Sequence, residues 1–103
     1  MSKEKAEFAA PWFTKTEAGK AFENFYNTCL NKSVLDDKTR ELLMVALACV
    51  FRCPHCTESH IKKALEAGCK KEEIIEALLI AAVEGAGTQL AWKKETFMEY
   101  LGR

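Results

Sequence analysis

The chain has 103 residues, the length of one domain with a limited core, and we expect a single domain over residues 1–103. Its hydrophobic content of 49% excludes an intrinsically disordered chain. Lys and Arg together number 15, as do Asp and Glu, so no basic excess points to a nucleic-acid or membrane-surface partner.

The start of the sequence and its cysteines indicate a cytoplasmic protein. Residues 1–5 lack the apolar stretch of a secretory signal peptide, and the longest apolar run, residues 42–51, is too short to span a bilayer. The sequence contains five cysteines. Because this number is odd and no secretion signal precedes them, a structural disulfide framework is not expected. In the cytoplasm a Cys-x-x-Cys pair more often serves redox chemistry or metal binding.

The first part of the chain predicts two helices. Apolar residues between positions 18 and 29 recur every three or four residues, the period of a helix with one apolar face. Asp36 and Asp37 are candidate N-caps for a second helix. Residues 42–51 give this second helix no polar face, so we expect it to be covered on all sides. It would be the central core helix, with part of its surface against another subunit.

Three more helices are expected towards the C-terminus. Pro54 suits the first turn of a third helix, where its missing N–H is not needed, and Gly68 suits the cap at the end of that helix. A fourth helix opens at residues 70–73, and we expect residues 85–87 to interrupt or bend it before a last helix over residues 88–100. No strand alternation is present. The sequence therefore predicts an all-α fold, a small bundle of about five helices in which consecutive helices run antiparallel.

The residues suited to catalysis gather where the second helix turns into the third. Cys53 and Cys56 are separated by two residues, and His60 follows Cys56 by four residues on the same helical face. With a rise of about 1.5 Å per residue along two antiparallel helices, Glu41 comes within reach of His60, directly or through one water. This order of cysteine, histidine and carboxylate predicts a proton relay. Taken alone, Glu41 would be an ordinary first-turn acid and His60 a surface residue.

A cysteine at the start of a helix is favoured as a thiolate, which is the reactive form of the side chain. A protonated His60 adds to this effect, and His55, between the two cysteines, is a second candidate cation. The partner cysteine can then trap a sulfenic acid or a mixed disulfide as an intramolecular disulfide between Cys53 and Cys56. The helix dipole alone favours attack by Cys53, whereas the proximity of His60 favours attack by Cys56.

The remaining cysteines allow a competing interpretation. Cys29 and Cys69 are expected to be inert, and Cys49, inside the apolar run, is expected to be buried and structural. With the cysteine pair and the histidine, Cys49 nevertheless completes a candidate zinc-binding set. The set is Cys49, Cys53, Cys56 and His60. Apolar surroundings and the lack of two separated ligand pairs argue against this site, and we predict neither a metal nor a cofactor.

At these residues the sequence resembles the alkylhydroperoxidase D-like family, also called the carboxymuconolactone decarboxylase family. The family pattern is Glu, eleven residues, Cys, two residues, Cys, three residues, His, and Glu41, Cys53, Cys56 and His60 fill it without a gap. His55 matches a histidine within the pair of the alkylhydroperoxidase D branch. The resemblance extends over roughly residues 36–100. It implies an all-helical fold, oligomers that are often hexamers, and thiol-dependent reduction of peroxides.

The resemblance also implies roles for the site residues. The second cysteine of the pair, Cys56, would attack the peroxide, Cys53 would resolve the intermediate, and His60 and Glu41 would relay the proton. Together with the proximity of His60, this leads us to assign Cys56 as the attacking residue. The decarboxylase branch of the family does not use this pair, so its presence argues against lactone decarboxylation.

The sequence therefore predicts a thiol-dependent antioxidant enzyme that reduces hydroperoxides. The alternatives are a disulfide reductase of the same family, a carboxymuconolactone-type decarboxylase and a zinc-stabilised interaction module. The expected partners are a hydroperoxide or disulfide substrate and a dithiol electron donor, for which family analogy suggests lipoyl-bearing proteins. Neither nucleic acid nor membrane is expected as a partner. We expect a homohexamer, with a homotrimer or dimer as alternatives.

Overall fold

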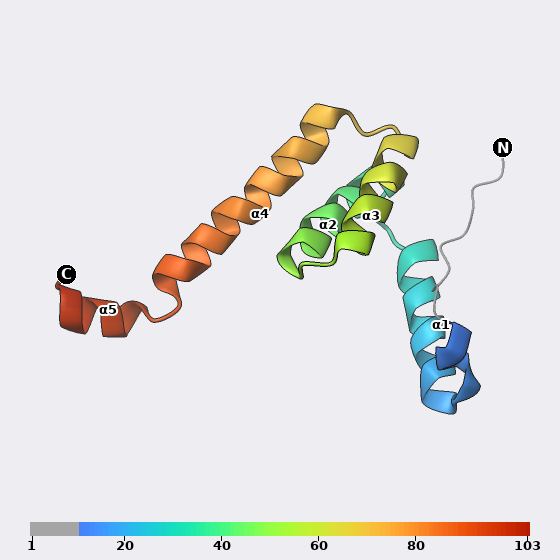
Figure 1. Cartoon of the computed structure of the whole chain (residues 1–103), viewed down its shortest axis with the longest axis horizontal. Coiled ribbons are helices and arrows are strands. Elements are labelled where there is room, and N and C mark those ends of the chain that lie inside the picture. Colours follow the sequence, from blue (N-terminus) through green and yellow to red (C-terminus); the bar gives the residue numbers. More distant parts are fainter. Residues whose placement is uncertain (1–10) are drawn as a thin grey trace. The chain divides into compact units, whose positions relative to one another are not determined.

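The computed structural model describes residues 11–103, which form five α-helices after a short 3₁₀ turn (Figure 1). None of these residues belongs to a strand. The predicted all-α fold with about five helices is therefore confirmed. The elements are η1 (Pro11–Lys15), α1 (Glu17–Asn31), α2 (Asp37–Val50), α3 (Pro54–Glu66), α4 (Lys71–Ala91) and α5 (Lys94–Leu101).

The chain divides into two compact units, one ending at Asp36 and the other running from Asp37 to Arg103. In the first unit η1 packs against α1, the helix that the apolar period between positions 18 and 29 predicted. Thr16 caps α1, because its side-chain oxygen accepts a hydrogen bond from the Gly19 N–H at 3.0 Å. The expected single domain over residues 1–103 stays a prediction, and residues 1–10 lie outside the described part.

The second unit is organised around a hairpin in which α2 and α3 lie side by side (Figure 1). The fourth helix, α4, packs mainly on α2 and less on α3. Their contacts enclose a small apolar core in which Val45 of α2 and Ala64 of α3 are completely buried. Cys69 and Ile74 complete this core from the start of α4 and the loop before it. The core thus fixes the hairpin and the first turns of α4.

A charged contact ties the start of α4 to α2. Glu73 accepts a hydrogen bond from the Lys70 N–H at 2.8 Å, and the Lys38 ammonium of α2 lies 3.4 Å from the same carboxylate oxygen. The backbone hydrogen bond, followed by the Lys38 charge, holds the pKa of Glu73 below its usual range. The contact caps the start of α4 and links it to α2.

The end of α3 has the geometry that Gly68 predicts. The Cys69 N–H donates to the Ala64 carbonyl at 2.9 Å and the Gly68 N–H donates to the Leu65 carbonyl at 3.1 Å, the two hydrogen bonds of a Schellman motif. Gly68 has a φ of 95°, a conformation that costs a residue with a side chain about 1–2 kcal/mol. A Cβ added to Gly68 would meet nothing within 4 Å, so the backbone conformation alone explains the glycine.

The expected interruption at residues 85–87 is wrong, because α4 continues as one helix from Lys71 to Ala91. A helical glycine costs about 1 kcal/mol relative to alanine but keeps its N–H and its helical hydrogen bonds. Neighbouring strong helix formers offset that cost. The break falls later, at Lys93, which has a φ of −127° and separates α4 from α5. The single last helix expected over residues 88–100 is therefore divided between α4 and α5.

The second helix is not covered on all sides within this chain. Glu41, Val45 and Ala48 are the buried residues of α2, whereas Leu43 and Leu47 are each 48% exposed. Within the single chain α2 is therefore buried on one side only. Burial of the exposed face by another subunit stays a prediction.

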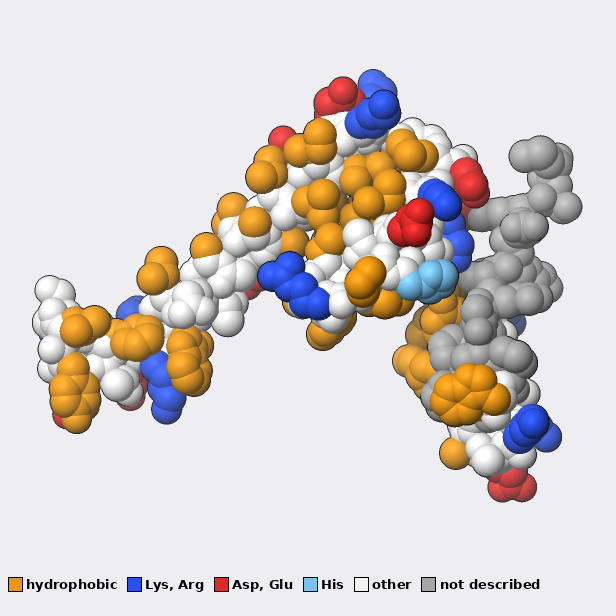
Figure 2. Space-filling model, viewed as in Figure 1, with side chains coloured by type: hydrophobic (Ala, Val, Ile, Leu, Met, Phe, Trp, Pro, Cys, Tyr) orange, Lys and Arg blue, Asp and Glu red, His pale blue; other side chains and the backbone are white. Residues whose placement is uncertain are grey.

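The exposed face of α2 continues onto α4. A groove of about 700 Å³ lies between the two helices, and hydrophobic side chains follow α4 along the visible face (Figure 2). Ile74 is the one buried residue of α4, although this helix is long and apolar enough, by length and composition alone, to cross a membrane. The segment that meets the length and hydropathy of a membrane span is thus α4, and not residues 42–51. The groove is lined in part by Leu43, Leu47, Val50, Ile80 and Trp92.

Candidate redox site

The turn between α2 and α3 places the cysteine pair. The Cys53 N–H donates to the Ala48 carbonyl at 3.0 Å and the Arg52 N–H donates to the Cys49 carbonyl at 3.2 Å, which is again a Schellman motif. Here the left-handed residue is Arg52, with a φ of 57°, rather than a glycine. The turn is short, so α3 starts directly after it and runs back along α2.

Cys53 and Pro54 define the start of α3. Cys53 is the N-cap residue, and its Sγ accepts a hydrogen bond from the Cys56 N–H at 3.2 Å. Pro54 occupies the first helical turn, as its sequence position predicted. Cys56 therefore lies in the first turn of α3, at the positive end of the helix dipole.

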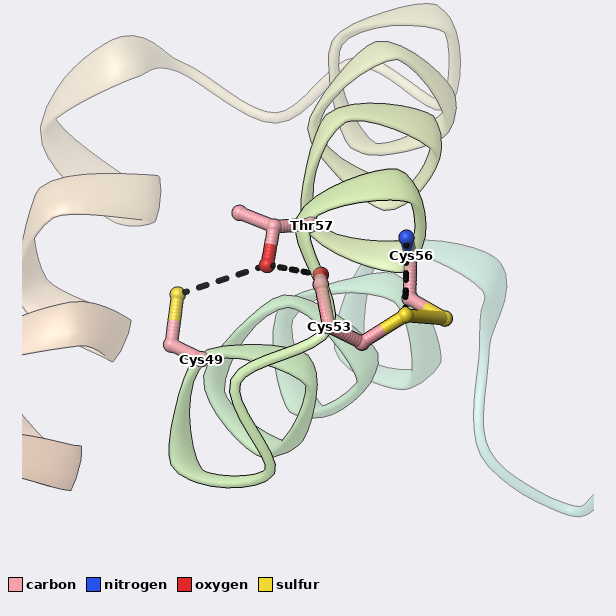
Figure 3. The surroundings of a disulfide bond; sticks show 4 residues. All are labelled: Cys49, Cys53, Cys56 and Thr57. Carbon is pink, nitrogen blue, oxygen red and sulfur yellow. Dashed lines mark hydrogen bonds between the residues drawn. A yellow bond between two sulfur atoms is a disulfide. The ribbon is translucent and has the colours of Figure 1, made fainter.

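Cys53 and Cys56 are joined by a disulfide, with their Cα atoms 5.2 Å apart (Figure 3). This separation is within the ordinary range for a disulfide, so the turn accommodates the bond without moving the backbone. Both cysteines are partly buried. The structure thus shows the pair in its oxidised form, and the redox activity of the pair stays a prediction.

Glu41 and His60 meet in the interior between α2 and α3. The His60 Nδ1 lies 2.7 Å from the Glu41 Oε1, and the two residues are only 8% and 6% exposed. A carboxylate only accepts, so Nδ1 carries the hydrogen and donates it. This tautomer leaves Nε2 as the nitrogen that can take up a proton. Helical rise predicted the approach of the two residues, and the structure brings them together directly.

Arg40 completes the environment of the carboxylate. Its Nε lies 3.5 Å from the Glu41 Oε2, and its Nη1 lies 3.0 Å from the Asp37 Oδ1 on the same helix. Glu41 therefore faces a histidine with one oxygen and a guanidinium with the other. The two contacts hold the Glu41 carboxyl group in place against the imidazole of His60.

His60 lies one helical turn after Cys56, on the face that the four-residue spacing predicts. While Cys56 is in the disulfide it has no thiol proton to share. Within the described part of the chain no hydrogen bond joins Cys56 to His60. Reduction of the disulfide would create that proton next to a base. The relay predicted from the sequence thus has its carboxylate and histidine in contact, and its thiol step stays a prediction.

The other site candidates take no part in the disulfide. His55 is exposed in the first turn of α3. The Cys49 Sγ is 3.9 Å from the Thr57 Oγ1 and points towards it, away from the disulfide (Figure 3). Cys69 is buried in the core, whereas Cys29, expected on an apolar stripe, is exposed on α1. The expectation that Cys29 lies in a core is therefore wrong for the described residues.

Zinc ligation would need the four candidate residues to converge on one point. Two of them are consumed in the disulfide, and Cys49 faces Thr57 instead. Within residues 11–103 no three His, Cys, Asp or Glu side chains gather as a metal site requires. The zinc-stabilised module therefore receives no support from this geometry.

The sequence analysis missed three residues that shape the site. Arg40 pairs with Glu41, Thr57 donates to the Cys53 carbonyl at 2.8 Å, and Arg52 occupies the left-handed position of the turn. The four-residue step from Cys53 to Thr57 was a readable signal, because threonine often bonds back to the carbonyl four residues earlier. The three-residue step from Asp37 to Arg40 also indicated an ion pair. Nothing in the sequence marked Arg52 as left-handed.

Comparison with known proteins shows the family of this chain. The sequence profile of the carboxymuconolactone decarboxylase family matches residues 16–94. The chain belongs to this family. The match crosses the boundary at Asp36 and includes every residue of the candidate site. A solved structure of a protein from Methanobacterium thermoautotrophicum agrees with a TM-score of 0.72 at 30% identity, covering 84% of this chain and 98% of that one.

Two curated relatives in the comparison are partial matches. "Uncharacterized protein 4 in cox locus" of Paracoccus denitrificans is 44% identical over 57 residues, which is 55% of this chain and 51% of that protein. "Alkyl hydroperoxide reductase AhpD" of Corynebacterium kroppenstedtii is 38% identical over 53 residues, 52% of this chain and 30% of that protein. The chain thus spans about half of one relative's length and less than a third of the other's.

Proposed function

We propose that this protein is a thiol-dependent peroxidase that reduces hydroperoxides through Cys53 and Cys56. The observation that carries the proposal is the disulfide at the start of α3, one helical turn before a buried histidine held by Glu41. Membership of the family and the partial match to an alkyl hydroperoxide reductase support an enzyme of this kind. The family name alone supports no particular reaction, because its members differ in their use of the cysteine pair.

The first step is attack by the Cys56 thiolate on a peroxide oxygen. His60 takes the thiol proton on Nε2, and the Glu41 carboxylate stabilises the resulting imidazolium. A sulfur–oxygen bond forms, the oxygen–oxygen bond breaks, and the departing alkoxide receives the proton from His60. Cys56 is left as a sulfenic acid and the peroxide as an alcohol.

The second step closes the disulfide seen in the structure. The Cys53 thiol attacks the sulfenic sulfur of Cys56, the sulfur–oxygen bond breaks, and the hydroxyl leaves as water with the thiol proton. Because Cys53 is the N-cap and Cys56 lies in the following turn, the two sulfurs meet without unwinding α3. An external dithiol then returns both cysteines to thiols.

A single-turnover experiment tests this function on the wild-type protein. We expect the reduced protein to lose two thiols per chain on mixing with one equivalent of cumene hydroperoxide, with Cys53–Cys56 as the disulfide found by peptide mass spectrometry. Oxidation of the pair by oxidised glutathione but not by peroxide would indicate a disulfide reductase instead. Loss of thiols mainly from Cys29, Cys49 or Cys69 would refute the assignment of the pair.

Glu41→Gln tests the positioning role of the carboxylate. Glutamine keeps an acceptor for the His60 Nδ1–H but removes the charge that stabilises the imidazolium, so we expect peroxide turnover to fall about 100-fold. The pH profile of turnover should change with it. Glu66→Gln, which removes an exposed glutamate at the end of α3, is the matched control and should keep both rate and profile. A Glu41→Gln enzyme with wild-type turnover would show that the pair is structural.

The exposed apolar groove between α2 and α4 supports assembly with further copies of this chain. A monomer rarely exposes a continuous apolar surface of this kind, and a symmetric oligomer would cover it with the same surface of a neighbour. Burial by a second copy also accounts for the apolar composition of α4. A hexamer in the cytoplasm is the form that we expect.

A further inference from the structure

Arg40, in the first turn of α2, contacts two carboxylates at once. Its Nη1 lies 3.0 Å from the Asp37 Oδ1, and its Nε lies 3.5 Å from the Glu41 Oε2. A guanidinium is a rigid planar fork, so the directions of its nitrogens are fixed relative to one another. The contact with Asp37 therefore restricts the direction from which Arg40 faces Glu41.

The position of Arg40 is unfavourable in two respects. A cation near the start of a helix faces the positive end of the helix dipole, where acidic side chains are preferred. The Arg40 side chain is also only 18% exposed, and removing a charge from water costs free energy unless opposite charges surround it. By contrast Lys38, in the same turn, is 45% exposed and pairs with Glu73 at the start of α4. The two carboxylates beside Arg40 are thus the contacts that offset its burial.

The Glu41 carboxylate uses one oxygen for each neighbour. Its Oε1 lies 2.7 Å from the His60 Nδ1, whereas its Oε2 faces the Arg40 Nε. The last torsion of a glutamate side chain has only a broad preference, so the side chain alone does not fix the plane of this group. A carboxylate that is held at both oxygens cannot rotate without losing a contact. Arg40 therefore restricts the carboxylate to the orientation that faces His60.

We infer that Arg40 is a positioning residue of the proposed relay, in which it acts through Glu41 and is itself anchored by Asp37. The oriented carboxylate keeps the imidazole hydrogen on Nδ1 of His60 and leaves Nε2 available as the base. The inference rests on the proposed function for one step, the transfer of the Cys56 thiol proton to His60. The relay thus extends from α3 into the first turn of α2.

Arg40→Gln should loosen the hydrogen bond between Glu41 and His60. Without the guanidinium the carboxylate loses its second contact, so the Nδ1–H is exposed to water more often. We expect the exchange of this hydrogen with water to become about tenfold faster. Proton NMR of protein with ¹⁵N-labelled histidine measures the exchange, and His55→Gln assigns the signals of the two histidines. Arg40→Lys keeps a charge without the fork and should restore part of the protection.

Lys38→Gln is the matched control. It removes one positive charge from the same turn of α2 and breaks the ion pair with Glu73, so it should leave the Nδ1–H exchange unchanged. An equal increase of exchange in Lys38→Gln and Arg40→Gln would overturn the inference, because it would show a general effect of charge at the start of α2. Unchanged exchange in Arg40→Gln would overturn it as well.

The reactivity of the Cys56 thiol gives a second measurement. Protein carrying Cys53→Ser is reduced and treated with iodoacetamide, and the alkylation of each cysteine is followed by peptide mass spectrometry. Because the thiolate is the reactive form, we expect Arg40→Gln in this background to slow alkylation of Cys56 about fivefold. Cys29, which is exposed on α1, is the internal reference and should react equally in both proteins. A Cys56 rate that does not depend on Arg40 would overturn its role in the relay.

Asp37→Asn tests the same role without deleting the arginine, and it replaces Arg40→Gln if that variant does not fold. Loss of the Asp37 charge releases one end of the guanidinium. We expect the exchange and the alkylation to change in the same direction as in Arg40→Gln, by about two- to threefold. A lower melting temperature with neither measurement changed would show a structural role only and would overturn the inference.

The outcome is distinguishable from failure of the proposed function, because neither measurement uses peroxide. Exchange and alkylation that depend on Arg40, in a protein that consumes no hydroperoxide, would refute the peroxidase and retain the positioning role. Peroxide turnover in a protein whose exchange and alkylation do not depend on Arg40 would retain the peroxidase and refute the positioning role.

Discussion

Cys56→Ser should abolish reaction with peroxide at the site, whereas Cys53→Ser should still consume one equivalent of peroxide and stop at a sulfenic acid on Cys56. Loss of the attacking thiol is expected to reduce turnover at least about 10³-fold, the scale of losing a covalent nucleophile. Cys53→Ser also stops turnover, because the resolving thiol is gone, but it leaves the first chemical step intact.

The structure provides one argument for attack by Cys53 and another for attack by Cys56. The Cys53 Sγ accepts the Cys56 N–H at the N-cap, a contact that would also stabilise a Cys53 thiolate. Cys56 in turn has His60 four residues later on the same helix, with Glu41 fixing the tautomer of that histidine. Proton removal by a positioned base is available to Cys56 from within α3, and this decides our assignment.

A sulfenic-acid probe measures the outcome on each variant after one equivalent of peroxide. Labelling of Cys56 in Cys53→Ser, with no label at Cys53 in Cys56→Ser, is the expected pattern. Cys29→Ser is the matched control, since this exposed cysteine on α1 takes part in no disulfide and its loss should leave labelling unchanged. The reverse pattern, with label only on Cys53, would show that the N-cap sulfur attacks and that the histidine acts on the resolving step.

Leu47→Glu should leave single chains in place of the oligomer that we propose. Leu47 is 48% exposed on α2 and lines the apolar groove with residues of α4. Removing a buried apolar contact at the centre of an interface costs about 2 kcal/mol or more, and the glutamate adds the cost of burying a charge. Such a loss raises the dissociation constant about 30-fold at each contact. The single chain tolerates the same change, because the side chain still reaches water there.

Light scattering at micromolar concentration measures the expected fall in mass. Leu65→Glu is the matched control, because Leu65 is similarly exposed, at 43%, on α3 and does not line the groove. It should leave the mass unchanged. A wild-type protein that is already monomeric at this concentration, or a Leu47→Glu protein with the wild-type mass, would contradict assembly through the groove.

The residues of the candidate site could be placed from the sequence because their geometry is local. A Pro54 helix start and a four-residue step decide that Cys56 and His60 share a face, and the constant helical rise along two antiparallel helices brings Glu41 to His60. The approximate bounds of α1 and α3 could be predicted from the sequence for the same reason, since helical period and capping depend on neighbouring residues in the chain. The roles of these residues in catalysis stay predictions.

Other features depended on surfaces that meet only after folding. Sequence pattern could not show that the glycines near residue 86 remain helical, because the balance between their cost and the stability of a long helix is spread over many residues. The apolar run of α2 predicted burial without showing that α3 and the first turns of α4 cover only one side of it. Apolar character predicts that a residue is buried, but it does not predict whether the same chain or another chain buries it.

The sequence by itself determined an all-α chain with a Cys-x-x-Cys pair at a helix start and a histidine and glutamate aligned with it. Those features arise from helical period, rise and capping, which act within a few residues. Only the tertiary structure decided that the Glu41–His60 pair is buried and that Arg52 takes the left-handed conformation in the turn after α2. These depend on how α2 and α3 pack around their shared turn, which no local pattern encodes.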